Sequence, residues 1–132
     1  MSSAPETVSS IGSFSVSLAV ADLGTSIEFY RKLGFDVTGG DEESWAILVN
    51  GQVVIGLFQG MFEDNILTFN PGWGVLGAEL DEFHDVRTLR DRFVDAGIEV
   101  ADDASTQESA SGPASFVIVD PDRNPILIDQ HR

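Results

Sequence analysis

The chain has 132 residues, of which 42% are hydrophobic, so it is long enough and apolar enough to fold as one compact domain. Its 7 Lys+Arg residues against 22 Asp+Glu give a formal charge of −15 at pH 7. That charge argues against binding to nucleic acid or to anionic membrane surfaces, because both need a basic face. No cysteine is present, which excludes disulfides, thiolate metal sites and cysteine nucleophiles. With only two histidines, a multi-histidine metal centre within one chain is nearly excluded.

The sequence carries no recognisable targeting or membrane segment. No apolar run reaches the roughly 18 residues that a membrane span requires. Residues 1–13 are small and polar, without the basic and apolar regions of a signal peptide. We therefore expect a cytoplasmic protein.

The first half of the chain is predicted to contain a strand, a helix and three further strands. Asp22 can cap the helix, and Gly34 supplies its stop. Asn50-Gly51 between two apolar runs favours a tight hairpin. In chain order, the predicted elements are a strand at 14–20, a helix at 23–33, and strands at 35–38, 45–49 and 52–59.

The second half repeats that order. Asp81 is a possible helix cap, and residues 124–130 align with residues 53–59. We interpret the chain as an internal duplication of a βαβββ unit, with the first unit at 14–59, a linker at 60–74 and the second unit at 75–130. The predicted elements of the second unit are a strand at 75–80, a helix ending at Gly97, an extended segment at 98–101, and strands at 114–119 and 125–130.

Two motifs on this duplicated frame resemble those of the vicinal oxygen chelate superfamily. They are residues 20–35 (VADLGTSIEFYRKLGF) and 120–128 (DPDRNPILI). The superfamily includes glyoxalase I, extradiol dioxygenases and bleomycin resistance proteins, and the resemblance extends over residues 14–130. It implies an α+β fold of tandem βαβββ units, forming a curved, partly open eight-stranded mixed sheet around a cleft with the helices outside. It also implies a homodimer, but no particular activity, because this fold supports many chemistries.

The resemblance places four metal-ligand positions at Ser15, Gly56, Val75 and Leu127. A glycine and two apolar side chains offer no donor atom, and a neutral hydroxyl is a weak lone ligand. We therefore expect neither a metal nor another cofactor. Arg123 stands where the second motif usually has glycine. Since glycine alone enters positive φ freely, the final turn is expected to differ in conformation.

Strand alternation assigns one face of each unit to helix packing and the other face to a cavity. Glu79 is predicted to point into that cavity, where it would pair with a ligand cation, act as a base, or simply be hydrated. Trp45 and Trp73 are expected to stack on a ligand, unless they are buried in the core or against a second subunit. His84 is expected on the surface, and His131 in a frayed terminus. The predicted ligand-binding residues are Ser15, Ser17, Trp45, Gly56, Phe58, Trp73, Val75, Glu79 and Leu127.

These observations leave three functions open. The first is a metal-free protein that sequesters a small apolar or cationic compound, as bleomycin resistance proteins do. The alternative is a lyase or isomerase with a non-standard or metal-free site, in which Glu79 is the candidate catalytic residue. The third is a regulatory partner that acts through its dimer surface.

Overall fold

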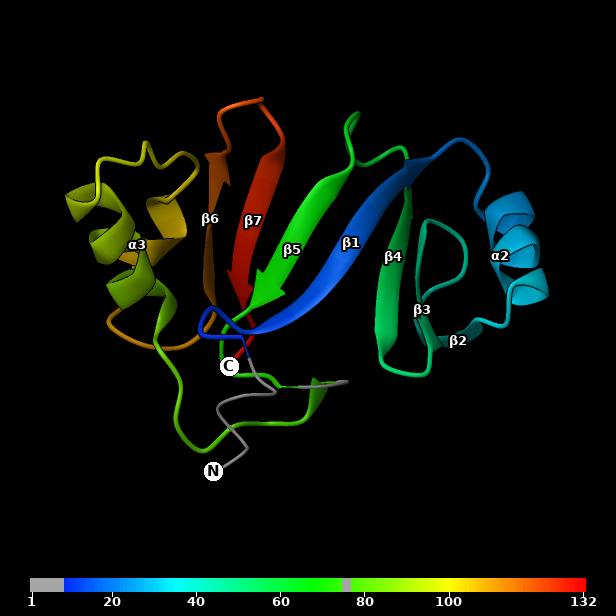
Figure 1. Cartoon of the computed structure of the whole chain (residues 1–132), viewed down its shortest axis with the longest axis horizontal. Coiled ribbons are helices and arrows are strands. Elements are labelled where there is room, and N and C mark those ends of the chain that lie inside the picture. Colours follow the sequence, from blue (N-terminus) through cyan, green and yellow to red (C-terminus); the bar gives the residue numbers. More distant parts are fainter. Residues whose placement is uncertain (1–8, 75–76) are drawn as a thin grey trace. The chain divides into compact units, whose positions relative to one another are not determined.

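A computed structural model describes residues 9–74 and 77–132 of the chain, which divides into two units. The N-terminal unit comprises residues 15–66. The C-terminal unit comprises residues 67–132 together with residues 9–14. Each unit combines one α-helix with a small mixed sheet, so the chain has the expected α+β fold (Figure 1).

The N-terminal unit follows the prediction closely. Its strands lie in the order β2-β3-β4-β1, with β4 antiparallel to β3 and parallel to β1. The Asp22 side chain accepts a hydrogen bond from the Thr25 amide at 2.9 Å, which caps the helix as predicted. Gly34, at φ 105°, follows its last turn. The elements are β1 (Ser13–Val20), α2 (Leu23–Lys32), β2 (Asp36–Gly40), β3 (Trp45–Asn50) and β4 (Val53–Gln59).

The C-terminal unit repeats this arrangement. Strand β5 runs parallel to β7, and β7 runs antiparallel to β6, as β1, β4 and β3 do in the other unit. An isolated bridge from Ala101 to Val117 stands where β2 would extend the sheet. The elements are β5 (Ile66–Asn70), α3 (Val86–Asp95), the 3-10 helix η2 (Ala104–Gln107), β6 (Ala114–Val119) and β7 (Pro125–Gln130).

The first strand of the C-terminal unit is not where the sequence predicted it. Strand β5 lies within the segment 60–74 that we expected to be a linker. Of the predicted strand at 75–80, residues 75–76 lie outside the described part, and Glu79 forms only an isolated bridge with Trp73. The apolar and polar residues of 75–80 alternate in sequence as they would in a strand. The strand that pairs with β7 is instead formed by residues 66–70. The described residues thus form seven strands rather than eight.

Two smaller predictions about turns and caps were also wrong. Asp85, not Asp81, caps α3, because its side chain accepts a hydrogen bond from the Arg87 amide at 2.9 Å. Arg123 adopts φ 72°, so the final turn keeps a left-handed residue without glycine. The Asp120 carboxylate holds this turn by accepting hydrogen bonds from the amides of its neighbours at 122 and 124.

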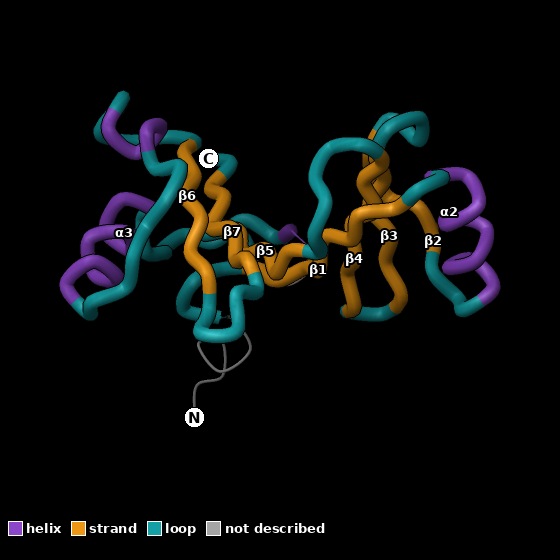
Figure 2. Tube along the Cα trace, turned by 90° about the horizontal axis from the view of Figure 1, so that it is seen from above, coloured by secondary structure: helices purple, strands orange, loops and turns teal. Residues whose placement is uncertain are grey.

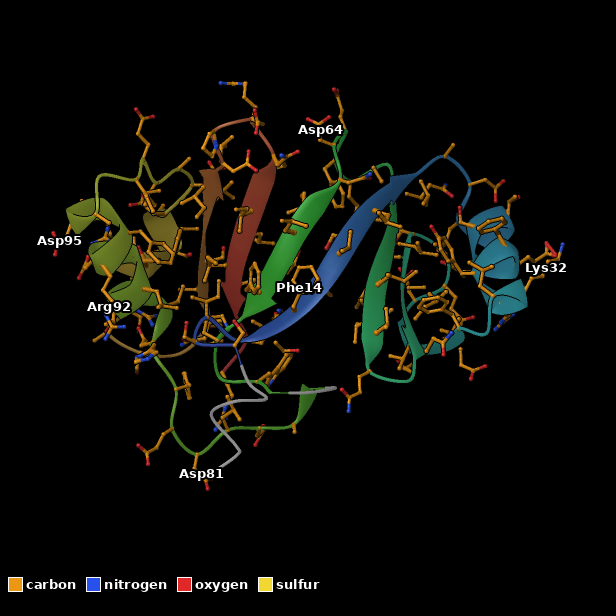
Figure 3. All side chains as sticks on the ribbon, viewed as in Figure 1. Phe14, Lys32, Asp64, Asp81, Arg92 and Asp95 are labelled. Carbon is orange, nitrogen blue, oxygen red and sulfur yellow. The ribbon has the colours of Figure 1, made fainter. Side chains whose placement is uncertain are left out.

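Each helix packs on one face of the sheet in its own unit (Figure 2). In the N-terminal unit, Leu23 and Ile27 of α2 pack against buried side chains of β3 and β4. In the C-terminal unit, Val86 and Leu89 of α3 pack against Phe116 and Ile128. Charged helix residues such as Lys32, Arg92 and Asp95 project outward (Figure 3). Among the described residues, no helix is long and apolar enough to cross a membrane.

A glutamine at the end of the last strand binds the first residue of the helix in both units. Gln59 Oε1 accepts a hydrogen bond from the Leu23 amide at 2.7 Å, and Gln130 Oε1 accepts one from the Val86 amide at 2.8 Å. Gln130 is 1% exposed, and its Nε2 donates to Asp85 Oδ1 and to the carbonyls of residues 112 and 132, each at 3.0 Å. This side chain therefore links β7 by hydrogen bonds to the start of α3 and to the backbone at residues 112 and 132.

We expect Gln130→Leu to lower the free energy of unfolding by about 3 kcal/mol, because it leaves a buried amide and a half-buried carboxylate without their partner. Gln59→Leu is the matched control. It removes one hydrogen bond at an exposed residue and should cost about 1 kcal/mol. Urea unfolding of both variants measures the difference, and equal small losses would contradict this role for Gln130.

Candidate functional site

Three aromatic side chains gather on the N-terminal unit and form what we call the aromatic platform. Trp45 on β3 and Phe58 on β4 are directly paired in the ladder, and their rings are stacked with centroids 6.0 Å apart and planes 4° apart. Phe62 contacts Phe58 with a centroid separation of 5.3 Å at 47°. All three side chains are half-buried. Parallel rings that keep partial exposure offer a face on which a planar ligand can stack.

The platform depends on glycine at position 56, which has no side chain. This residue lies between Ser17 of β1 and Ile47 of β3 in the ladder. A Cβ atom built at Gly56 would lie 2.6 Å from Cε2 of Phe58 and 3.3 Å from Cδ1 of Ile47. The Phe58 ring therefore lies over the bare backbone of Gly56, and any side chain there would displace it.

A carboxylate fixes the start of the strand that carries Trp45. Asp41 Oδ1 accepts hydrogen bonds from the amides of Glu43, Ser44 and Trp45 at 2.9, 2.8 and 3.1 Å, and its Oδ2 accepts one from the Ser44 hydroxyl at 2.8 Å. These bonds, those from the Ser44 and Glu43 amides foremost, hold the pKa of Asp41 well below its usual range. The turn thus places a permanent negative charge beside the Trp45 backbone.

Five of the predicted ligand-binding residues lie on adjacent strands of this unit. Ser15 and Ser17 are on β1, and strand alternation directs them to the same face as Gly56 and Phe58. Ser17 is buried and Ser15 is half-buried. With Trp45, these residues lie on three adjacent strands of the sheet.

The other predicted residues belong to the C-terminal unit. Leu127 is half-buried on β7, paired with Thr68 and Val117. Glu79 is exposed and lies outside any strand, so its predicted inward position in a strand is wrong. Val75 lies outside the described residues.

Trp73 and His131 form a contact that the sequence did not predict. Their rings are parallel within 5°, with centroids 4.9 Å apart. His131 Nε2 lies 3.1 Å from Asp129 Oδ2. The hydrogen bond with Asp129, aided by the charge of that carboxylate and opposed by burial, raises the pKa of His131. His131 is therefore held in place rather than frayed, whereas His84 is exposed as expected.

The residues at the four implied metal positions do not fit a metal ion. Gly56 is covered by the Phe58 ring, and Leu127 has no donor atom. Because β5 is the first strand of the second repeat, its residue aligned with Ser15 is Ile66, another apolar side chain. In the ranges 9–74 and 77–132, no three His, Asp or Glu side chains come together as a cation site would require.

Two solved structures share the fold over nearly their whole length. A protein described as an NAD-dependent benzaldehyde dehydrogenase from Legionella pneumophila is 19% identical, with a TM-score of 0.66 over 90% of this chain and 99% of that one. A glyoxalase/bleomycin resistance protein/dioxygenase superfamily member from Vibrio splendidus is 15% identical, with a TM-score of 0.58 over 89% and 97%. At these identities the likeness concerns the fold alone.

Sequence comparison identifies the family. No curated protein sequence gives a significant match to the chain. The family model described as the glyoxalase/bleomycin resistance protein/dioxygenase superfamily matches residues 11–128, which include both motifs and all but the last two residues of the two repeats. The chain therefore belongs to the glyoxalase/bleomycin resistance protein/dioxygenase superfamily.

Proposed function

We propose that the protein is a metal-free binding protein that holds a small planar compound, apolar or cationic, on the aromatic platform. The observation that carries this proposal is the parallel stack of Trp45 and Phe58 over the bare backbone of Gly56. Half-buried stacked rings favour flat apolar ligands, and adjacent small residues leave them room. Ser15 supplies a hydroxyl at the edge of the same face.

The charge distribution favours a cation over an anion. The chain carries a net charge of −15, and Asp41 holds a fixed carboxylate at the backbone amide of Trp45. An aromatic face attracts a cation, and a nearby carboxylate strengthens that preference. Glu79, which we predicted as the recognising carboxylate, is exposed and belongs to the other unit, so its role stays a prediction.

We expect N-methylquinolinium to bind saturably and more tightly than neutral quinoline, which has nearly the same shape but no charge. Trp73→Phe is used as the background, so that Trp45 is the one tryptophan and its fluorescence reports on the platform. Calorimetry on the same samples gives the affinity and the stoichiometry. Absence of saturable binding by both compounds would contradict the proposal.

In the same background, Gly56→Ala should weaken binding roughly threefold to tenfold, because the new Cβ pushes the Phe58 ring out of the stack. Gly39→Ala on strand β2 of the same sheet is the matched control. Its Cβ would meet Ile47 at 3.6 Å, an ordinary contact. Equal affinities of the two variants would mean that the stack over Gly56 does not determine binding.

The donor set predicts that the purified protein retains no stoichiometric transition metal. Ser15, Gly56 and Leu127 supply one neutral hydroxyl between them, which is too weak a set to hold a divalent ion through dialysis. Elemental analysis tests this after the protein has been incubated with the metal ion and then dialysed against metal-free buffer. About one tightly held metal ion per chain would refute the metal-free part of the proposal.

We also propose that the protein is a homodimer, as members of this superfamily often are. Large apolar side chains remain exposed on the N-terminal unit, including Phe29 and Leu33, each 56% exposed. Burial of such side chains between two copies is a common basis for a stable dimer. Sedimentation velocity at micromolar concentration should give twice the chain mass, and a clean monomer would rule the dimer out.

A further inference from the structure

The C-terminal unit contains a paired carboxylate and imidazole that the proposed binding function does not use. His131 Nε2 lies 3.1 Å from Asp129 Oδ2, and the imidazole is stacked in parallel on the Trp73 indole. The His131 side chain is 46% exposed, so solutes can reach it. Its other ring nitrogen, Nδ1, has no hydrogen-bond partner among the described residues.

The two residues that flank the imidazole hold it in position. Gln130 is anchored by its buried hydrogen bonds. The Arg132 guanidinium donates to the carbonyls of Gly72 and Leu80 at 2.8 and 2.7 Å, and it lies 5.1 Å from the Phe83 ring centroid. His131 is thus fixed on both sides, and the Trp73 face restricts rotation of its ring. Such a preorganised imidazole differs from an ordinary surface histidine.

The duplication shows that Asp129 and its strand partner Ser115 stand where the other unit has an aromatic pair. Aligning β7 with β4 places Asp129 at the position of Phe58, and aligning β6 with β3 places Ser115 at the position of Trp45. Ser115 and Asp129 are directly paired, as Trp45 and Phe58 are. The same sheet position therefore carries stacking groups in one unit and polar groups in the other.

We propose that His131 and Asp129 form a general-base pair that hydrolyses neutral activated esters, an activity separate from the aromatic platform. His131 Nδ1 takes a proton from a water molecule while the water oxygen forms a bond to the acyl carbon. The ester C–O bond breaks, its electron pair leaves with the alkoxide or phenolate, and the imidazolium returns its proton to solvent. Asp129 stabilises the imidazolium and orients the ring. No oxidant, metal or cofactor takes part.

The charges around the imidazole support a base rather than an anion site. Asp129 on β7 faces His131 directly. Glu79 belongs to the segment that bridges to Trp73, whereas the nearest cation in sequence, Arg132, is engaged by two carbonyls and the Phe83 ring. A neutral ester avoids the repulsion that an anionic substrate would meet in a chain of charge −15.

The test measures hydrolysis of p-nitrophenyl acetate between pH 5 and 9. We expect the wild-type rate constant to rise through one ionisation, because only the neutral imidazole is a base. His131→Gln should lower the rate at pH 8 about tenfold, whereas the control His84→Gln should leave it unchanged.

Asp129→Asn distinguishes the pair from a lone histidine. Loss of the carboxylate lowers the pKa of His131, so the midpoint of the pH–rate profile should move to lower pH. In the His84→Gln background one histidine remains, and NMR titration of its ring gives the same pKa directly, even if His131→Gln folds poorly. Equal rates for the two histidine variants, or coincident midpoints with and without Asp129, would overturn the proposal.

Discussion

The structure depends on one repeated contact, in which the glutamine at the end of a strand accepts the first amide hydrogen of a helix. The first amides of a helix have no partner within the helix, so another group must satisfy them. Gln59 does this for α2, and Gln130 does it for α3. Each contact fixes the start of a helix against the last strand of its unit. The buried apolar side chains decide which face of the sheet the helix covers, and the glutamine fixes where that helix begins.

The same frame supports different chemistry in the two units because the open face is not needed for folding. The faces that the helices cover are alike. Ile55 and Leu57 belong to the core that α2 covers, and Ile126 and Ile128 belong to the core that α3 covers. The open faces have diverged, and Phe58 stands where the other repeat has Asp129. Stability constrains the first set of positions, while the second set is free to change.

The sequence predicted those features that local physics determines. Asp22, Gly34 and the Asn50-Gly51 turn define their elements through neighbouring residues, and the hairpin register then places Gly56 and Phe58 on one face. The Asp41 turn is equally local, and a side chain that accepts amides a few residues ahead is a signal that could have been recognised.

Features decided by distant partners were not predictable. Strand β5 was missed because residues 75–80 alternate more regularly, while the pairing that selects residues 66–70 comes from β7, far along the chain. His131 was judged from its place near the end of the chain. Its fixed position follows from Trp73 and from the buried anchoring of Gln130, neither of which is visible in the local pattern.

The missing metal ligand at residue 56 and the aromatic platform have the same structural basis. A metal-binding side chain at residue 56 would project into the volume that the Phe58 ring occupies, since even a Cβ atom would lie 2.6 Å from Cε2. A ligand to a cation and a ring stacked on Trp45 therefore exclude each other in this conformation of Phe58. Glycine at 56 removes the donor and admits the ring at the same time. A carboxylate at this position would displace the Phe58 ring from the stack. It would also hold a metal ion only weakly, because the other implied ligand positions contribute no charged oxygen or nitrogen.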